Sequence, residues 1–332
     1  MVPFLVLDLH ADVRLYAPSM TPLTHPTRTR LSDPLASAPD LTGRRAVVTG
    51  GSSGLGLVTT RTLLQGGAQV VIGARDTARA EHARDRLAEE LSLPAGRLIV
   101  APLDLIDPHS IRDFAKAVGD APLDLLVLNA GISSVPLRHD HAGIESQFAT
   151  NHLGHFALTG HLLPALEPGI EPRIVTVSSA LYTGATLDLD ELSNRTSYSP
   201  GRAYSRSKLA NVIFAVELQR RLSAQGSTVR SFAAHPGMAR TPLHTTYPSA
   251  ATRILTSAVA RVIGRDPEPA DIGVLTAALS AQATPTLFWG PAGSKTAPDA
   301  VGQPFAAVAT DPATAAALWS KSEQLSGVGI LS

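Results

Sequence analysis

The chain has 332 residues, of which 44% are hydrophobic and 17% charged, and its 28 basic residues balance 28 acidic ones. A chain of this size can bury a large core unaided, and the lack of cysteine excludes disulfides and thiol catalysis. Balanced charge argues against a nucleic acid partner, and no run of 18 apolar residues is present to span a membrane. We therefore expect a globular cytoplasmic protein.

The first 40 residues differ from the rest in composition. They contain six prolines, at positions 3, 18, 22, 26, 34 and 39, and no sustained periodicity. This pattern predicts a disordered N-terminal extension over 1–40, with Met20 as an alternative start, followed by a single domain over 41–332.

From residue 45 onward, short apolar runs alternate with longer amphipathic stretches. The expected strands are 46–49, 70–72, 98–101, 125–128, 174–177 and 229–233. The expected helices are 55–65, 77–91, 111–118, 144–166 and 203–223, with weaker signals for helices near 270–283 and 312–325 and a short apolar run at 286–289. The alternation predicts an α/β fold: one doubly wound, Rossmann-type parallel sheet with helices on both faces.

A glycine-rich loop joins the first of these strands to its helix. Glycines let a pyrophosphate approach the backbone at a helix N-terminus, where N–H groups are unpaired. The residues expected to bind the cofactor here are Gly50, Ser52, Ser53, Gly54, Leu55 and Gly56. Two alternatives stay open: a plain turn, and the G-x-S-x-G elbow of a serine hydrolase with Ser52 as nucleophile.

Further candidates follow the other strands, where ligands of such sheets bind. Arg75 could pair with a 2′-phosphate, which favours NADP(H), and the less favoured alternative is a solvated side chain. Asp76, which follows Arg75, is expected to cap the next helix. Asp104 is available to contact a base, because Asp107 caps the helix after it. The small residues Asn129, Ala130 and Gly131 permit close approach of a cofactor, although a plain turn would have the same composition.

The most informative spacing is Tyr204 and Lys208 on one predicted helix. Residues i and i+4 share a helix face, so the ammonium can lie near the phenol. A nearby cation favours phenolate and lowers a pKa that is otherwise near 10. Ser178 and Ser179 at a strand end, and Asn151 on the preceding helix, could complete a polar active site.

Together these motifs resemble the short-chain dehydrogenase/reductase family over about 43–241, and in particular its branch of retinol dehydrogenases and protochlorophyllide reductases. The resemblance implies that Tyr204 is the general acid/base, that Lys208 tunes it and binds the nicotinamide ribose, and that Ser179 binds the substrate oxygen. It implies further that Asn151 holds a water of the proton relay. The remaining pocket residues that it implies are Pro236, Gly237 and Thr241. Tyr198 rivals Tyr204 by position, but Arg202 stands four residues after it where the pattern has lysine.

Two other features carry weaker signals. His139, His141, His152 and His155 fit no compact metal-ligand spacing, so we expect capping or packing roles and no metal. An apolar stripe over 238–265 is either core or, as the resemblance implies, a substrate lid.

These observations predict an NADP(H)-dependent oxidoreductase that interconverts a carbonyl and an alcohol on a lipophilic small molecule. The alternatives are a non-catalytic NADP(H) sensor on the same fold and, less favoured, the serine hydrolase. The sequence leaves open whether the protein is a homo-oligomer.

Overall fold

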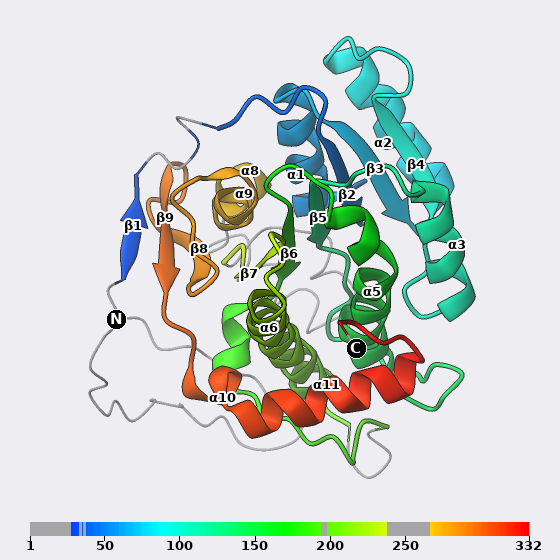
Figure 1. Ribbon diagram of the computed structural model, residues 1–332, viewed down its shortest axis with the longest axis vertical. Coiled ribbons are helices and arrows are strands. Elements are labelled where there is room, and N and C mark those ends of the chain that lie inside the picture. Colours follow the sequence, from blue (N-terminus) through cyan, green and yellow to red (C-terminus); the bar gives the residue numbers. More distant parts are fainter. Residues whose placement is uncertain (1–27, 33–34, 36–37, 194–197, 238–265, 332) are drawn as a thin grey trace.

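A computed structural model describes residues 28–32, 35, 38–193, 198–237 and 266–331 (Figure 1). All nine strands belong to one sheet, in the order β1-β9-β8-β7-β6-β5-β2-β3-β4. The strands are β1 (Thr29–Leu31), β2 (Arg45–Thr49), β3 (Gln69–Ala74), β4 (Leu98–Pro102), β5 (Leu125–Leu128), β6 (Arg173–Val177), β7 (Arg230–Ala234), β8 (Phe288–Gly293) and β9 (Pro298–Gln303).

Strands β2 to β8 pair in parallel and form the Rossmann-type core that the sequence predicts. The chain runs outward from β2 through β3 to β4, and then returns to place β5 on the other side of β2. The order therefore reverses between β2 and β5, and ligands of doubly wound sheets bind in the crevice at such a point. The predicted fold class is confirmed.

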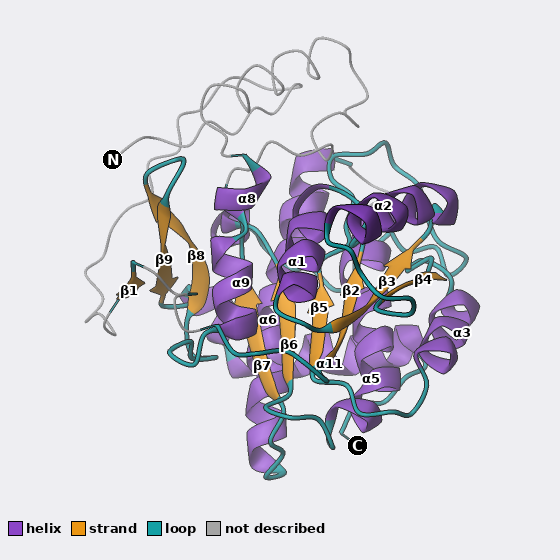
Figure 2. Ribbon diagram, turned by 90° about the horizontal axis from the view of Figure 1, so that it is seen from above, coloured by secondary structure: helices purple, strands orange, loops and turns teal. Residues whose placement is uncertain are grey.

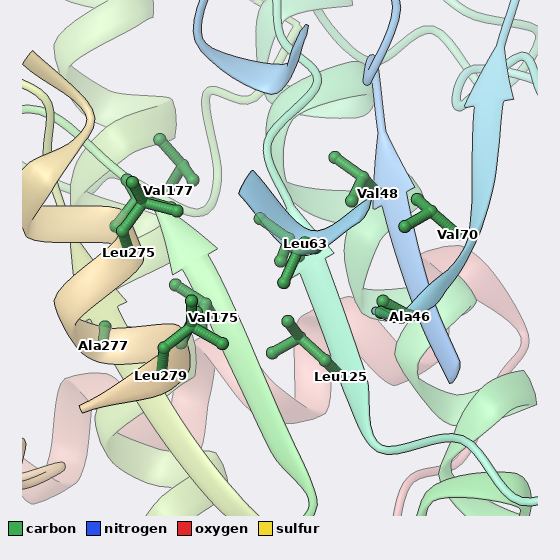
Figure 3. Close-up of a cluster of buried hydrophobic side chains, with 14 of the residues drawn as sticks. Ala46, Val48, Leu63, Val70, Leu125, Val175, Val177, Leu275, Ala277 and Leu279 are labelled. Atoms are coloured by element: carbon green, nitrogen blue, oxygen red, sulfur yellow. The ribbon is translucent and has the colours of Figure 1, made fainter. Parts of the chain in front are cut away.

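Helices cover both faces of this sheet (Figure 2). One face is covered by α1 (Gly54–Gln65), α2 (Thr77–Glu90) and α9 (Ile272–Leu279), and the other by α3 (Pro108–Val118), α5 (Gly154–Leu166) and α6 (Pro200–Ala224). Figure 3 shows the first interface, where Leu275 and Leu279 of α9 lie against Val175 and Val177 of β6. The helix starts confirm two caps predicted from sequence: Asp76 accepts from the N–H of Arg79, and Asp107 from that of His109.

The edge beyond β8 is antiparallel, which differs from an all-parallel sheet. β9 pairs antiparallel with β8, and β1 pairs antiparallel with β9, where Arg30 forms an ion pair with Asp299. β1 lies inside 1–40, where we expected disorder. Residues 29–31 are ordered because β9 offers a row of unpaired backbone groups that a three-residue strand can satisfy; residues 1–27 lie outside the described part of the chain.

The helix expected over 144–166 is divided into three parts: α4 (Ser146–Phe148), a π-helical turn η1 (Ala149–Leu153) and α5. The first part begins after Glu145, whose carboxylate accepts from the N–H groups of Gln147 and Phe148. Such π-turns are rare and occur often at functional sites. Here the turn contains Asn151.

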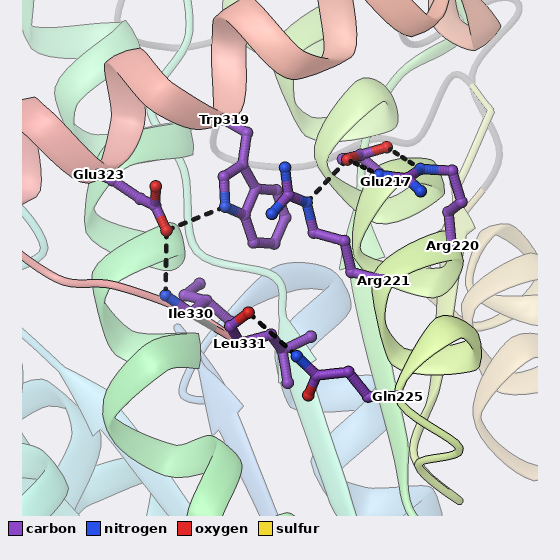
Figure 4. Close-up of polar contacts among 8 residues, drawn as sticks. All are labelled: Glu217, Arg220, Arg221, Gln225, Trp319, Glu323, Ile330 and Leu331. Carbon is purple, nitrogen blue, oxygen red and sulfur yellow. Dashed lines mark hydrogen bonds and ion pairs between the residues drawn. The ribbon is translucent and has the colours of Figure 1, made fainter.

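The C-terminal helix α11 (Pro312–Ser326) lies across α6 and α5 (Figure 1). Figure 4 shows how it is fixed: the guanidinium of Arg221 lies 4.2 Å from the centre of the Trp319 ring, and Glu217 accepts from Arg221. Trp319 in turn donates to Glu323, which also accepts from the N–H of Ile330. The remaining short elements are η2 (Ala180–Gly184), α8 (Pro267–Ala270) and α10 (Ala307–Thr310). None of the helices in the described ranges is long and apolar enough to cross a bilayer.

Candidate active site

The predicted glycine loop forms the turn between β2 and α1. Gly50 has φ +66°, a conformation that side chains disfavour. A Cβ on Gly56 would lie 2.4 Å from the carbonyl oxygen of Gly50, so only glycine lets the helix pack this closely on the turn. Ser53 is the N-cap residue of α1, but its side chain makes no capping bond. Ser52, Gly54 and Leu55 lie in the same turn, as predicted.

Thr49, the last residue of β2, joins this turn to the one after β5. Its hydroxyl accepts from the N–H groups of Asn129 and Ala130, both at 2.9 Å. The side chain of Asn129 returns to the carbonyl oxygen of Thr49 at 2.8 Å. The turn at Asn129–Gly131 is therefore held against β2, at the point where the sheet order reverses. Asn129 connects this turn to the glycine turn after β2.

Asn151 is fully buried, and its side chain fixes the segment that follows Gly131. The amide oxygen accepts from the N–H of Ile132 at 2.8 Å, and the amide nitrogen donates to the carbonyl of Ile132 and to Ser207, both at 2.9 Å. These bonds use both N–H groups of the side-chain amide and hold Asn151 against both backbone groups of Ile132.

Lys208 is buried next to the turn at Asn129–Gly131. Its ammonium donates to the carbonyl oxygen of Val177 at 3.0 Å and lies 5.7 Å from the centre of the Tyr204 ring. A Cβ on Gly131 would lie 3.7 Å from this nitrogen, so the lysine reaches the turn as well as the tyrosine. Burial lowers the pKa of Lys208 to about 8, which still leaves it mainly protonated at pH 7.

The two serines after β6 have different surroundings. Ser178 is buried and donates to the backbone carbonyl of Lys208 at 2.7 Å, so it holds α6 against the end of the strand. Ser179 is half-buried, and its hydroxyl accepts a longer bond, 3.3 Å, from the N–H of Leu181. Ser179 is the one placed to meet a ligand.

Tyr198 is a weaker candidate than Tyr204 for the general acid/base. Its hydroxyl donates to the carbonyl of Val135 at 2.6 Å and accepts from Gln147 at 3.0 Å, and burial raises its pKa. A phenol held in this way supports the loop after β5 and is a worse proton donor.

Arg75 and Asp104 follow β3 and β4. Arg75 is exposed and has no hydrogen bond or ion pair to any described residue. Asp104 is less free than predicted, because one carboxylate oxygen accepts from the N–H of Ile106 at 3.2 Å. The turn before α3 therefore uses part of the hydrogen-bonding capacity of Asp104, even though Asp107 is the residue that caps the helix.

Pro236 and Gly237 follow His235, the first residue after β7, and are half-buried. The N–H of Gly237 donates to Nδ1 of His235 at 3.0 Å. Thr241 and the predicted lid over 238–265 lie outside the described residues.

The serine hydrolase reading finds no support in the described part of the chain. No histidine there hydrogen-bonds Ser52, and His155 of α5, which reaches the end of the same strand, bonds Thr49 instead. Among those residues no group of three or more histidine, aspartate or glutamate side chains could hold a metal ion.

His155 is the residue whose place in the site was missed from the sequence, where it received only a capping or packing role. Its ring contacts both Thr49 and Asn151, at 2.9 and 3.0 Å. The only signal available was its position four residues after Asn151, on the same helix face.

Together the fold and this geometry define a doubly wound α/β protein with a glycine turn at its switch point, where a half-buried tyrosine lies beside a buried lysine. A family model described as short chain dehydrogenase matches residues 44–251. The chain belongs to the short-chain dehydrogenase/reductase family, and the resemblance drawn from its motifs is confirmed.

Among curated proteins, the chain is 43% identical over 214 residues to retinol dehydrogenase 14 of Homo sapiens, covering 60% of this chain and 63% of that protein. It is 38% identical over 207 residues to polyprenol dehydrogenase of Homo sapiens, covering 60% and 62%. The matched stretch thus spans less than two thirds of either relative.

Solved structures match more completely. A structure of an uncharacterized protein from Mycobacterium paratuberculosis is 39% identical and covers 89% of this chain and 97% of that one, with a TM-score of 0.70. The RhlG/NADP active-site complex of Pseudomonas aeruginosa is 28% identical, covering 74% and 92%, with a TM-score of 0.55.

Proposed function

We propose that the protein is an NADP(H)-dependent oxidoreductase that interconverts a carbonyl and an alcohol on a lipophilic small molecule. The observation that carries the proposal is the placement of Lys208. Its buried ammonium lies near both the Tyr204 ring and the turn at Gly131. The same ammonium bonds the carbonyl of Val177, the last residue of β6, and Ser179 lies two residues further along the chain. A cation so placed favours the phenolate of Tyr204.

The chain offers a suitable surface for the cofactor. The turn from Gly50 to Gly56 presents the start of α1, which suits a pyrophosphate. Arg75, which pairs with no residue in the described part of the chain, suits a 2′-phosphate, and the RhlG neighbour, which was solved as a complex with NADP, supports the same choice. Asp104 would contact the adenine, and Lys208 the ribose. When bound, NADP(H) supplies the hydride.

The residues of the chain supply position and a proton. Ser179 would donate a hydrogen bond to the carbonyl oxygen of the substrate, and Tyr204 would give that oxygen its proton. Lys208 has three donor hydrogens and one acceptor, Val177, among the described residues, so it can bind further groups while it tunes the phenol. Asn151 would offer its backbone carbonyl to a water that returns the proton to the tyrosine.

Two exposed aliphatic side chains favour a lipophilic substrate. Leu137 lies on the loop after β5, and Leu181 lies two residues after Ser179, with 37% and 43% of their surfaces exposed. The names of the curated relatives, retinol and polyprenol dehydrogenases, point to long apolar alcohols as well.

The test is NADPH oxidation, followed by absorbance, against ketones, aldehydes and quinones that include a homologous series of methyl ketones. Each added methylene that is buried contributes about 0.8 kcal/mol, so kcat/KM should rise roughly fourfold per carbon until the pocket is full. A preference for small charged substrates would refute the lipophilic assignment. Tight NADPH binding with no turnover of any carbonyl would favour the sensor instead.

A further inference from the structure

His155 is a buried histidine, 1% exposed, that uses both ring nitrogens in hydrogen bonds. Nε2 lies 2.9 Å from the hydroxyl of Thr49, at the end of β2, and Nδ1 lies 3.0 Å from the backbone carbonyl oxygen of Asn151, in the π-turn η1. The His155 side chain thus connects the end of β2 to η1, the helical turn that follows β5 in the chain.

The surrounding bonds determine where the ring carries its proton. The hydroxyl oxygen of Thr49 already accepts from the N–H groups of Asn129 and Ala130, which occupies both of its lone pairs. Its own hydrogen must then be donated, and Nε2 of His155 at 2.9 Å is a nearer acceptor than the carbonyl of Val127 at 3.4 Å. Nε2 is therefore the acceptor, and Nδ1 carries the hydrogen and donates it to Asn151.

The ring remains neutral in this arrangement. Burial, together with the nearby charge of Lys208, lowers the pKa of His155 to about 3. A second proton would also place an N–H at Nε2 against a hydroxyl oxygen that has no free lone pair. The neutral Nδ1–H tautomer alone satisfies both neighbours.

We infer that His155 is a positioning residue, which ties the Asn129–Gly131 turn, through Thr49, to the backbone carbonyl of Asn151. The inference rests on the proposed function, in which that turn receives the cofactor and that carbonyl belongs to the proton path. His155 keeps the two in register while touching neither cofactor nor substrate.

His152, which lies in η1 three residues before His155, provides a matched control. It too is 1% exposed, but its ring packs among Phe148, Phe156 and Phe214, and its Nε2 bonds Ser322 of α11. It contacts neither Thr49 nor the turn after β5 through any described hydrogen bond. Its loss should therefore affect stability alone.

The experiment separates the two bonds of His155 with isosteric amides. The amide of glutamine overlaps the Nε2 end of an imidazole and keeps the acceptor for Thr49, whereas that of asparagine overlaps the Nδ1 end and keeps the donor to Asn151. The variants are His155→Gln, His155→Asn, His155→Leu and the control His152→Leu. For each we would measure the Kd of NADPH by fluorescence titration, kcat with a ketone at saturating NADPH, and Tm.

We expect His155→Asn and His155→Leu to weaken NADPH binding by about tenfold, because Thr49 loses its acceptor and the turn loosens. His155→Gln should bind NADPH within about threefold of the wild type but lose about tenfold in kcat, because Asn151 loses its donor. His152→Leu should lower Tm and leave both constants unchanged. Equal Kd values for the Gln and Asn variants, or effects on Tm alone, would overturn the inference.

Two further measurements keep the test decisive. If His155→Leu does not fold, the comparison of the Gln and Asn variants is repeated in a Thr49→Val background, where their difference in Kd should vanish. Persistence of that difference would also overturn the inference. A wild-type protein that binds no NADPH refutes the proposed function itself, and this outcome is distinct from either result on His155.

Discussion

The two ends of the parallel sheet are both rich in buried polar side chains, but they use them differently. At the amino ends of the strands, Asp124 accepts from the backbone N–H groups of Arg45 and Ile170, at 2.7 and 2.6 Å. Arg173 donates to two carbonyls at the end of α9, both at 3.0 Å. These charged groups cap backbone that would otherwise be buried unpaired.

At the carboxyl ends of β2, β5 and β6, backbone is held by neutral groups, the hydroxyls of Thr49 and Ser178 and the amide of Asn151. Two cations at this edge of the sheet, Lys208 and, after β3, Arg75, keep donors in excess of their partners among the described residues. A buried charge is thus no sign of a site by itself. Unused hydrogen-bonding capacity beside a rigid backbone is the better sign.

The largest expected effect is at the carboxyl end. Tyr204→Phe removes only the hydroxyl that would transfer the proton, and positioned acid/base groups contribute roughly 10²- to 10⁴-fold to rate. We expect kcat to fall by at least that order, with the Kd of NADPH nearly unchanged, as measured by steady-state kinetics and fluorescence titration.

Tyr198→Phe is the matched control for this substitution. Its hydroxyl bonds the carbonyl of Val135 and the amide of Gln147, so its loss should reduce the free energy of unfolding by about 1 to 3 kcal/mol with little change in kcat. A larger loss of rate for Tyr198→Phe than for Tyr204→Phe would reverse the assignment.

The next effect is at the amino end, and it should appear in stability. Asp124→Ala leaves two backbone N–H groups without an acceptor, each costing about 1 to 3 kcal/mol, so urea unfolding should show a loss of roughly 2 to 6 kcal/mol. Asp124→Asn retains one acceptor oxygen and should lose less. NADPH affinity of the folded protein should not change in either variant; a tenfold change would show that the two ends are coupled.

Arg75→Ala tests the unpaired cation at the carboxyl end. A charge-assisted bond is worth about 1.5 to 3 kcal/mol, so NADPH affinity should fall roughly 10- to 100-fold while NADH affinity barely changes. Arg79→Ala is the control, because Arg79 is also exposed but already lies 4.0 Å from Asp76. Equal losses for both cofactors would remove the case for a 2′-phosphate contact.

The sequence predicted those features that depend on local pattern. The βα alternation, the glycine turn, the caps at Asp76 and Asp107, and the Tyr204–Lys208 spacing are all set by residues close together in the chain. Strand β1 was missed because its pairing with β9 joins residues about 270 positions apart, such as Arg30 and Val301. Strand β9 pairs locally with β8 but was missed because its proline, aspartate and glycine are residue types that strands disfavour. The bonds of His155 were missed for the same reason as β1, since Thr49 lies 106 residues away.

The smallest expected effect is a dependence of stability on pH. Burial lowers the pKa values of His152 and His155 to about 3, below the value of about 6.5 expected in the unfolded chain. As the pH falls below 6.5 the unfolded chain binds protons first, so the free energy of unfolding should drop, by up to about 1.4 kcal/mol per pH unit for each histidine.

Asp271 opposes this trend. It is buried between α1 and α9, where it accepts from Thr59 at 2.7 Å, and burial raises its pKa to about 7. Here the folded state binds its proton first, so this carboxyl adds stability as the pH falls from 7 toward 4. Burial raises the pKa of Glu145 as well, so Glu145 acts in the same direction. Urea unfolding at pH 6.5, 5.75 and 5.0 resolves the two signs. His152→Leu should flatten the loss of stability with acid by about 1.4 kcal/mol per pH unit, and Asp271→Asn should steepen it by a similar amount. If both substitutions changed the slope in the same direction, then either His152 would be charged in the folded protein or Asp271 would be ionised there, against what their burial implies.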